Sequence, residues 1–290
     1  MQYLKLKAYA KVNLVLEVIG RLENGYHDIK TIFQTVDLFD DIVIRDSTDV
    51  LVDFINGEGI DPRNNLVMKA VQIIREETAC NYGAHITVTK RIPVGSGLGG
   101  GSSDAATTLH GLNLKWNLRL TKSTLKEMAS RIGADVPFFL EGGLAVGTGK
   151  GDSLRVLCNQ NQIFLVLVDI PHSFTEKTKF LYEFLDPSFY TSGLKVSAFI
   201  RQHENGVFSP DSIYNVFTQL AETHFPDFGY YKKSLYELGC KHVSLSGTGP
   251  VLFSPFQTKE SAQDVCNRLL KKGIKAHCVQ SVSSERVKDG

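Results

Sequence analysis

Hydrophobic and polar residues alternate with a period of two near the start of the chain. Residues 3–19, rich in Val, Leu and Ile, follow this pattern and predict one or two strands. Residues 20–26, GRLENGY, interrupt it with an Asn-Gly turn signal. Residues 29–38, 41–45 and 50–54 predict further strands. The first strand region lacks the apolar core of a signal peptide, so we expect no cleaved leader.

Helical periodicity replaces the alternation further along. Residues 66–80 carry apolar side chains at helical spacing, and residues 85–90 return to a strand pattern. A helix of small residues is expected at 103–112 and a second helix at 123–132. The glycine-rich stretch Gly142 to Gly151 predicts a turn between strands.

The second half begins with a buried strand at 163–169, after the polar run NQNQ. Helices are expected near 175–186, 213–222, 228–239 and 258–271, and short strands near 243–246, 250–254 and 275–280. We therefore predict an N-terminal domain over residues 1–158 and a C-terminal domain over residues 159–290. Strands and helices interleave without strict alternation, which favours the α+β class.

Composition narrows the possible functions. Hydrophobic residues make up 42% of the 290 and charged residues 22%, close to a globular average. With 32 Lys plus Arg and 31 Asp plus Glu, the net charge of +1 lacks the basic excess of a nucleic-acid-binding protein. The sequence contains no run of about 18 apolar residues, so we expect no membrane span. The five cysteines include no CxxC pair, which favours reduced thiols in a cytoplasm and disfavours structural zinc.

Glycine is concentrated in residues 93–106, PVGSGLGGGSSDAA, where five glycines lie between positions 95 and 101. Glycine is useful where the backbone takes positive φ or approaches a ligand closely. Backbone N–H groups in such a loop, and the start of the helix after it, bind anions. Ser102 and Ser103 stand where the expected helix begins and can cap it or offer hydroxyls to phosphate or Mg²⁺. We predict a phosphate-binding loop; a tight turn without a ligand is the alternative.

Two better-known phosphate motifs do not fit this loop. The Walker A pattern GxxxxGK[ST] is absent. Gly95, Gly97 and Gly100 spell GxGxxG, but a dinucleotide fingerprint requires a parallel βαβ unit, whereas the preceding strands read as a meander.

Two polar positions stand out in apolar surroundings. Lys11 and Asn13 lie two apart on a predicted strand and so share one face, which predicts either a polar cavity or the exposed face of an edge strand. Asp135, in RIGADVPFFL, is an isolated carboxylate in partly buried company, and a buried charge needs a partner. A simple turn aspartate is the alternative.

The motif PVGSGLGGGSSDAA resembles the phosphate-binding motif of the GHMP kinases. The start, AYAKVNLVLEVIGRLENGYHDIKTIFQTVDL, is more specific, and resembles the branch of that family that acts in the non-mevalonate isoprenoid pathway. The resemblance runs from Lys7 to Gly151 and reappears at LSGTGPVLF, residues 245–253. It implies a two-domain GHMP kinase fold: an N-terminal domain like ribosomal protein S5, a C-terminal α/β domain, and an active site between them.

The resemblance also implies roles. GADVPFF matches the family's catalytic aspartate motif, so Asp135 would accept or orient the proton of a substrate hydroxyl, and Lys11 would contact it and stabilise developing charge. ATP would be bound by Pro93, Val94, Gly95, Ser96, Gly97, Leu98, Gly99, Gly100, Gly101, Ser102 and Ser103. No protein metal ligand is expected, and Mg²⁺ would accompany the nucleotide.

The implied substrate site centres on NGYH. Tyr26 and His27 would stack on and hydrogen-bond a cytosine, or else form a loop packing pair. Tyr182 would stack on the opposite face of the cytosine, or else belong to the core. The full set of substrate-binding residues is Asn13, Tyr26, His27, Tyr182, Gly247, Thr248 and Gly249, where the turn SGTG at 246–249 is otherwise a plain hairpin. One departure is that Asn215 is followed by Val216, where the family usually has Asp.

Together these features predict an ATP-dependent kinase that phosphorylates the 2-hydroxyl of 4-diphosphocytidyl-2-C-methyl-D-erythritol, a cytidine diphosphate polyol. Another small-alcohol kinase of the same family, such as a homoserine kinase, is the first alternative, and NGYHDIKT argues against it. An RNA-binding module is the remote alternative, because the N-terminal fold type also occurs in ribosomal proteins. We expect no nucleic-acid or membrane partner and a cytoplasmic location; the sequence leaves the oligomeric state open.

Overall fold

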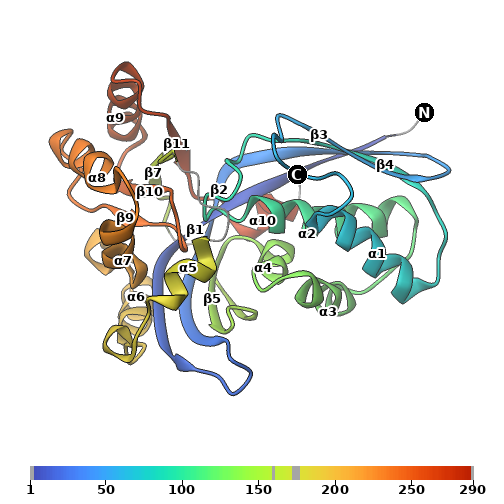
Figure 1. Cartoon of the computed structure of the whole chain (residues 1–290), viewed down its shortest axis with the longest axis horizontal. Coiled ribbons are helices and arrows are strands. Elements are labelled where there is room, and N and C mark those ends of the chain that lie inside the picture. The colour runs from blue at the N-terminus through green and yellow to red at the C-terminus, as the bar shows by residue number, and fades with distance from the viewer. Residues whose placement is uncertain (1–2, 159–160, 172–176, 289–290) are drawn as a thin grey trace.

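Two β-sheets, each covered by helices, build the molecule (Figure 1). The computed structural model describes residues 3–158, 161–171 and 177–288. Strands and helices are mixed in order within each half, and the predicted α+β class is confirmed.

The first sheet is built on a long antiparallel hairpin of β1 (Leu4–Arg21) and β2 (His27–Arg45). Its other described strands are β3 (Val50–Ile55), β4 (Ala84–Thr89), β5 (Leu144–Gly149), β6 (Ser153–Leu157) and β8 (Tyr214–Asn215). The main path runs β3-β4-β2-β1-β8, and β5 pairs with both β2 and β6. The register of the hairpin shifts between Asn13 and Val15, which leaves Leu14 as the extra residue of a bulge.

Four helices pack on this sheet: α1 (Leu66–Thr78), α2 (Gly100–Lys115), α3 (Lys122–Ile132) and α4 (Val136–Glu141). They cover one of its faces (Figure 1). The side chains of Asn65 and Thr121 cap α1 and α3 by accepting the N–H groups of Met68 and Thr124. Buried apolar residues of these helices and of β2 and β4 form one core.

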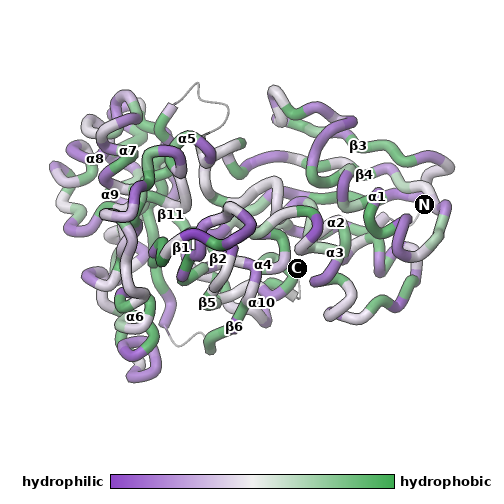
Figure 2. Tube along the Cα trace, turned by 60° about the horizontal axis from the view of Figure 1, so that its bottom comes forward, coloured by the Kyte–Doolittle hydropathy of each residue, from purple (hydrophilic) through white to green (hydrophobic). Residues whose placement is uncertain are grey.

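The second sheet has the order β11-β7-β10-β9, with β7 (Phe164–Val168), β9 (Ser244–Leu245), β10 (Leu252–Phe256) and β11 (Ala276–Gln280). The helices after β7 are α5 (Lys177–Glu183), α6 (Leu194–Glu204), α7 (Phe217–His224), α8 (Phe228–Glu237), α9 (Lys259–Lys271) and α10 (Ser284–Lys288). Short 3₁₀ turns lie at Pro187–Phe189 and Pro210–Ser212. In Figure 2, α8 and α9 change between hydrophobic and hydrophilic along the trace, as amphipathic surface helices do.

A shared core joins the two sheets. It contains Ala10 and Val12 of β1 together with Leu167 of β7, Phe253 of β10 and Val279 of β11. Backbone pairing adds to it, because β8 runs parallel to β1 and an isolated bridge joins Val36 to Ser281. The two sheets therefore pack against one another through this core.

Some predicted elements are wrong. The strands expected at 29–38 and 41–45 are one continuous strand, β2, and the turn expected at 142–151 contains β5. The helix expected at 213–222 begins only at Phe217, because Tyr214 and Asn215 pair with β1. Part of the helix expected at 175–186 lies outside the described residues. The domain boundary after residue 158 adjoins residues 159–160, which also lie outside them, and stays a prediction.

Candidate active site

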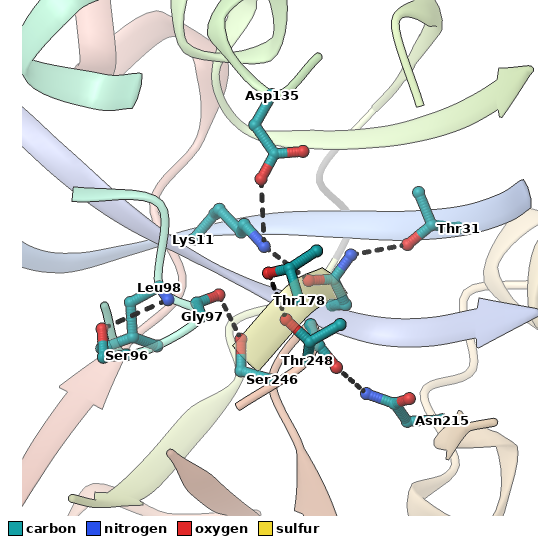
Figure 3. Close-up of polar contacts among 12 residues, drawn as sticks. Lys11, Thr31, Ser96, Gly97, Leu98, Asp135, Thr178, Asn215, Ser246 and Thr248 are labelled. Carbon is teal, nitrogen blue, oxygen red and sulfur yellow. Dashed lines mark hydrogen bonds and ion pairs between the residues drawn. The ribbon is translucent and has the colours of Figure 1, made fainter. Parts of the chain in front are cut away.

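Lys11 and Asp135 point toward one another (Figure 3). Lys11 lies on β1, and its Nζ is 3.4 Å from Oδ2 of Asp135. Asp135 occupies the N-cap position of α4 but makes no capping hydrogen bond there, so its carboxylate is turned to the lysine. The Lys11 side chain is 4% exposed and that of Asp135 is 34% exposed. The pair joins a buried cation to a carboxylate that solvent, or a ligand, can reach.

Asn13 lies beside this pair, on the same face of β1. Its Oδ1 accepts a hydrogen bond from the Lys11 Nζ at 2.6 Å, and its Nδ2 donates to Thr31 Oγ1 at 2.8 Å. Lys11 and Asn13 are each only 3% exposed. They therefore line a polar interior and do not form the exposed edge face that was the alternative.

The glycine loop leads directly into α2. The helix begins at Gly100, after Gly99 as N-cap in the left-handed conformation, and its first ladder bond runs from Ser103 N to Gly99 O at 2.9 Å. The N–H groups of Gly100, Gly101 and Ser102 precede that bond and lie at the positive end of the helix dipole. The expectation that Ser102 or Ser103 stands at the helix start was wrong, because both lie inside the first turns. Ser103 is also buried.

Gly97 is required by the protein's own packing. Its φ is +81°, and a Cβ there would lie 2.2 Å from the carbonyl oxygen of Ser246. Ser246 Oγ donates to Gly97 O at 3.1 Å, and Val251 N donates to Ser96 O at 3.2 Å. The two glycine turns are therefore bound together. Gly101 differs, since its added Cβ would meet only Leu66 Cδ1, at 3.7 Å.

The second turn is fixed by Asn215. Its Nδ2 donates to the carbonyl oxygens of Leu245 and Gly247 at 2.8 and 2.7 Å, and its Oδ1 accepts from Phe217 N at 2.9 Å. The neighbouring Val216, where an Asp was expected from the family pattern, is 4% exposed and packs in the core of the second sheet. An apolar side chain thus fills that position in this chain.

The remaining residues of the turn contact three different parts of the molecule. Gly247 lies close to Lys11 and Asn13 on β1, because an added Cβ would be 3.4 Å from both Asn13 Oδ1 and Lys11 Nζ. Thr248 Oγ1 lies 2.9 Å from Thr178 Oγ1 on α5. Gly249 is buried against Leu245. The structure brings this turn, the glycine loop and the Lys11–Asp135 pair to one place (Figure 3).

An aromatic cluster of His27, Tyr182 and Tyr190 lies at the start of β2. The ring of His27 is 4.8 Å from that of Tyr182 and 6.3 Å from that of Tyr190. His27 is 9% exposed, and its Nε2 has no hydrogen-bond partner among the described residues. Burial, and then the charge of Arg21, lowers the pKa of His27, which favours a neutral ring. Tyr26 is 61% exposed, and the ammonium of Lys150 lies 5.4 Å from its ring centre.

The hydroxyl of Tyr182 is affected by burial and by the charge of Asp135. Burial raises the pKa of this hydroxyl, and the negative charge of Asp135 raises it further. Tyr182 also packs on Phe217, so the alternative of a core residue is true of one side of its ring.

A cavity of about 240 Å³ adjoins the glycine loop. Its walls include the apolar Phe54, Ile60 and Leu66, the loop residues 93–95 and 100–101, and the charged Lys90 and Asp104. Lys90 Nζ lies 2.5 Å from Asp40 Oδ2 and 2.6 Å from Asp104 Oδ2. An apolar slot beside an anion-binding loop suits a planar base attached to phosphates.

The sequence did not single out several of these residues. Lys150 lies in the stretch taken for a turn, and Lys90 ends a predicted strand. Thr31 and Thr178 carry no motif of their own. Only Asp104 offered a signal, because it lies within SSDAA. Among the described residues, no three His, Cys, Asp or Glu side chains gather to hold a metal ion. No helix in the described ranges is long and apolar enough to cross a membrane.

The fold and the two joined glycine turns define a GHMP kinase. Residues 65–143 match the GHMP kinases N terminal domain, and residues 202–275 match the GHMP kinases C terminal family. A solved homoserine kinase from Cytophaga hutchinsonii superposes with a TM-score of 0.74 over 98% of this chain and 95% of its own, but at 17% identity it shows the fold alone.

Proteins of higher sequence identity show which branch of the GHMP kinases the chain belongs to. A 4-diphosphocytidyl-2-C-methyl-D-erythritol kinase of Dehalococcoides mccartyi is 35% identical over 96% of this chain and 98% of its own. One from Alkaliphilus metalliredigens is 32% identical over 99% of both chains. The crystal structure of a 4-(cytidine 5′-diphospho)-2C-methyl-D-erythritol kinase covers 96% of this chain and 99% of its own, with 29% identity and a TM-score of 0.82. The chain belongs to the 4-diphosphocytidyl-2-C-methyl-D-erythritol kinase family.

Proposed function

We propose that the chain transfers the γ-phosphoryl group of ATP to the 2-hydroxyl of 4-diphosphocytidyl-2-C-methyl-D-erythritol, in the non-mevalonate route to isoprenoid precursors. A bond forms between the hydroxyl oxygen and the γ-phosphorus, the bond from that phosphorus to the β–γ bridging oxygen breaks, and ADP leaves. The observation that carries the proposal is the position of the Lys11–Asp135 pair beside the two joined glycine turns. Family membership supports it over a homoserine kinase.

Asp135 is proposed to receive or orient the proton of the attacking hydroxyl. Its carboxylate is partly exposed and has no capping role, so it is available to a substrate. Lys11 is proposed to stabilise the charge that develops on the transferred group, because its buried ammonium lies beside that carboxylate. Catalysis of phosphoryl transfer rests largely on such positioning and electrostatics.

ATP is proposed to bind with its phosphates on the loop and the start of α2, and its adenine in the adjoining apolar cavity. The residues assigned to this site are those of 93–103 given above, except that Gly97 acts through the second turn and Ser103 is buried. Mg²⁺ is proposed to be held chiefly by phosphate oxygens and water. The Ser102 hydroxyl, in the first turn of α2, is the protein oxygen of the loop that fits it, and a bound Mg²⁺ would neutralise phosphate charge.

The cytosine is proposed to lie against Tyr26, His27 and Tyr182. The free Nε2 of a neutral His27 can pair with a polar edge of the base, while the tyrosines offer aromatic faces. Asn13, Gly247, Thr248 and Gly249 would line the passage from the base to the reacting hydroxyl. We further propose a cytoplasmic location, because all five cysteines are free thiols.

The test is a coupled assay of purified protein with ATP, Mg²⁺ and 4-diphosphocytidyl-2-C-methyl-D-erythritol. ADP should appear in step with phosphorylated substrate, and the Asp135→Asn variant, purified in the same way, should exclude a contaminating kinase. Homoserine, mevalonate and an RNA filter-binding assay cover the alternatives. ADP release that does not depend on the cytidine substrate, or release with homoserine in its place, would reject the proposal.

A further inference from the structure

A chain of three buried hydrogen bonds leads from a backbone carbonyl to the catalytic lysine. Thr31 Oγ1 donates to Val15 O at 2.7 Å, Asn13 Nδ2 donates to Thr31 Oγ1 at 2.8 Å, and Lys11 Nζ donates to Asn13 Oδ1 at 2.6 Å. Thr31 is fully buried, and Asn13 and Lys11 are nearly so. Thr31 is thus linked to Asp135 through two side chains, without contacting it.

The direction of every bond in this chain is fixed by chemistry. A backbone carbonyl only accepts, so the single hydroxyl hydrogen of Thr31 is committed to Val15 O. Thr31 Oγ1 can then only accept from Asn13, which must present its NH₂ group to it. The amide oxygen of Asn13 is therefore the atom that faces Lys11. With the amide reversed, two donors would meet at Lys11 and the bond to it would be lost.

The strands explain why Thr31 can reach Asn13. Asn13 pairs with Phe33, and Thr31 lies two residues from Phe33, so all three side chains share one face of the sheet. The bulge at Leu14 follows Asn13 directly, and Val15, which supplies the carbonyl, follows the bulge. The ring of Phe33 lies under the same lysine, 5.5 Å from its Nζ.

We propose that Thr31 is a positioning residue for phosphoryl transfer: its hydroxyl sets the Asn13 amide so that Lys11 is held toward Asp135. The inference rests on the proposed function. The hydrogen bonds of Thr31 run to Asn13 and Val15 and not to the nucleotide loop or the aromatic cluster. Its loss should therefore lower turnover and leave ATP binding nearly unchanged.

The experiment compares Thr31→Val, Thr31→Ser and wild type. Valine keeps the β-branched shape but has no hydroxyl, whereas serine keeps the hydroxyl. Thr31→Val should lower kcat by on the order of 10–100-fold, as small misplacements of catalytic groups do, and Thr31→Ser should restore most of it. Thr108→Val is the matched control, because Thr108 is fully buried and its hydroxyl has no partner among the described residues. It should keep wild-type kcat.

Two further readouts separate positioning from a general loss of structure. In an Asn13→Ala background, Thr31→Val should lower kcat little further, because Thr31 acts through Asn13. The side-chain amide of Asn13, followed by NMR with ¹⁵N-asparagine, should exchange slowly in wild type and Thr31→Ser and faster in Thr31→Val. Wild-type kcat and slow amide exchange in Thr31→Val, or an equal loss with Asn13 absent, would overturn the inference. An inactive wild type would count against the proposed function instead, while the amide measurement would still test Thr31.

Discussion

Two buried lysines of the first sheet are paired with aspartates in different ways. Lys90 lies 2.5 and 2.6 Å from the carboxylates of Asp40 and Asp104, and those two side chains are 0% and 2% exposed. Lys11 lies 3.4 Å from one carboxylate, that of Asp135, which is 34% exposed. We call the first cluster closed, because its three charged side chains are almost fully buried, although Lys90 and Asp104 also line the cavity beside the glycine loop. The second pair is open, because its carboxylate is partly exposed.

The difference has an electrostatic consequence. Burial raises the pKa of Asp104 to about 7, against the opposing charge of Lys90, while the charge of Asp40 adds to the rise. Burial alone would lower the pKa of Lys90, but the two carboxylates outweigh it and its pKa is raised. The charges of such a buried cluster interact with one another, so they affect the stability of the fold. The open pair keeps a carboxylate available to a ligand, which is the arrangement that catalysis requires.

The largest expected effect is on the open pair. Asp135→Asn keeps the shape of the side chain but cannot take up the proton, so kcat should fall by on the order of 10²–10⁴-fold. The thermal midpoint should barely change, because the carboxylate is partly exposed and caps nothing. Steady-state assays and thermal melts on the same preparation measure both. A variant with near wild-type kcat would show that the assignment of Asp135 is wrong.

Breaking the closed cluster should affect stability instead. Lys90→Met leaves two buried carboxylates without their cation and should cost about 3–5 kcal/mol of unfolding free energy. Denaturant titration gives this value. Lys69→Met is the matched control, since Lys69 donates to the carbonyl of Ile132 and its loss should cost about 1 kcal/mol. Equal losses in the two variants would remove the distinction between the clusters.

The closed cluster should also make stability depend on pH. The pKa of Asp104 rises from 3.8 in the unfolded chain to about 7 in the folded one, so the folded chain holds an extra proton between these values. Its contribution to stability is therefore lost as pH rises from about 4 to about 7. Asp104→Asn should reduce that fall in stability. The change in unfolding free energy should be smaller than that caused by Lys90→Met, because the Lys90 cation remains. Denaturant titrations at pH 5 and 7.5 compare the variant with wild type; parallel curves would contradict the account.

Substitution of a substrate-binding residue should change substrate affinity, and neither turnover nor stability. Tyr26→Ala removes an exposed aromatic face and should weaken binding of the cytidine substrate by about 1–3 kcal/mol, as for base–aromatic stacking. The KM for ATP and the unfolding free energy should stay close to wild type. Tyr236→Ala, at a similarly exposed tyrosine on α8, is the control. If Tyr26→Ala changes the KM for ATP and the KM for the cytidine substrate equally, Tyr26 does not stack on the cytosine.

The smallest expected effect concerns the nucleotide loop. Gly101→Val adds a side chain at an exposed position near the positive end of α2 without a clash, and should weaken ATP binding about tenfold, or about 1.4 kcal/mol. Calorimetric titration with a non-hydrolysable ATP analogue measures this. Gly229→Val, where an added Cβ meets nothing within 4 Å, is the control. Unchanged affinity in a folded Gly101→Val protein would mean that the phosphates do not approach this residue.

Local patterns predicted much of the fold. The long hairpin, α1 and α3 follow from period and caps, because those signals act within a few residues. The strand β5 was missed because its glycines, such as Gly147, imitate a turn, although Gly147 is required where Phe33 and Thr31 pack against it. The helix α6 carries no cap side chain of its own; Glu17 from β1 accepts the N–H groups of Lys195 and Val196 at its start. A cap supplied from another element leaves no local trace.

The site was predictable where residues form motifs and hidden where they meet only in space. The glycine loop, Lys11 and Asp135 could be named from their strings. The packing of Gly97 against Ser246 O depends on a contact across about half of the chain. Thr31, Lys150 and Thr178 are ordinary residues whose positions follow from strand register and turn geometry, so no sequence pattern marks them.

The most direct test of the open pair is a double-mutant cycle of Lys11→Met and Asp135→Asn, read by single-turnover phosphoryl transfer with saturating ATP and 4-diphosphocytidyl-2-C-methyl-D-erythritol. Groups that act as one unit lose most of their effect with the first substitution. The double variant should therefore be little slower than either single variant, with circular dichroism showing that all three are folded. Fully additive losses would contradict the claim that Lys11 and Asp135 work together.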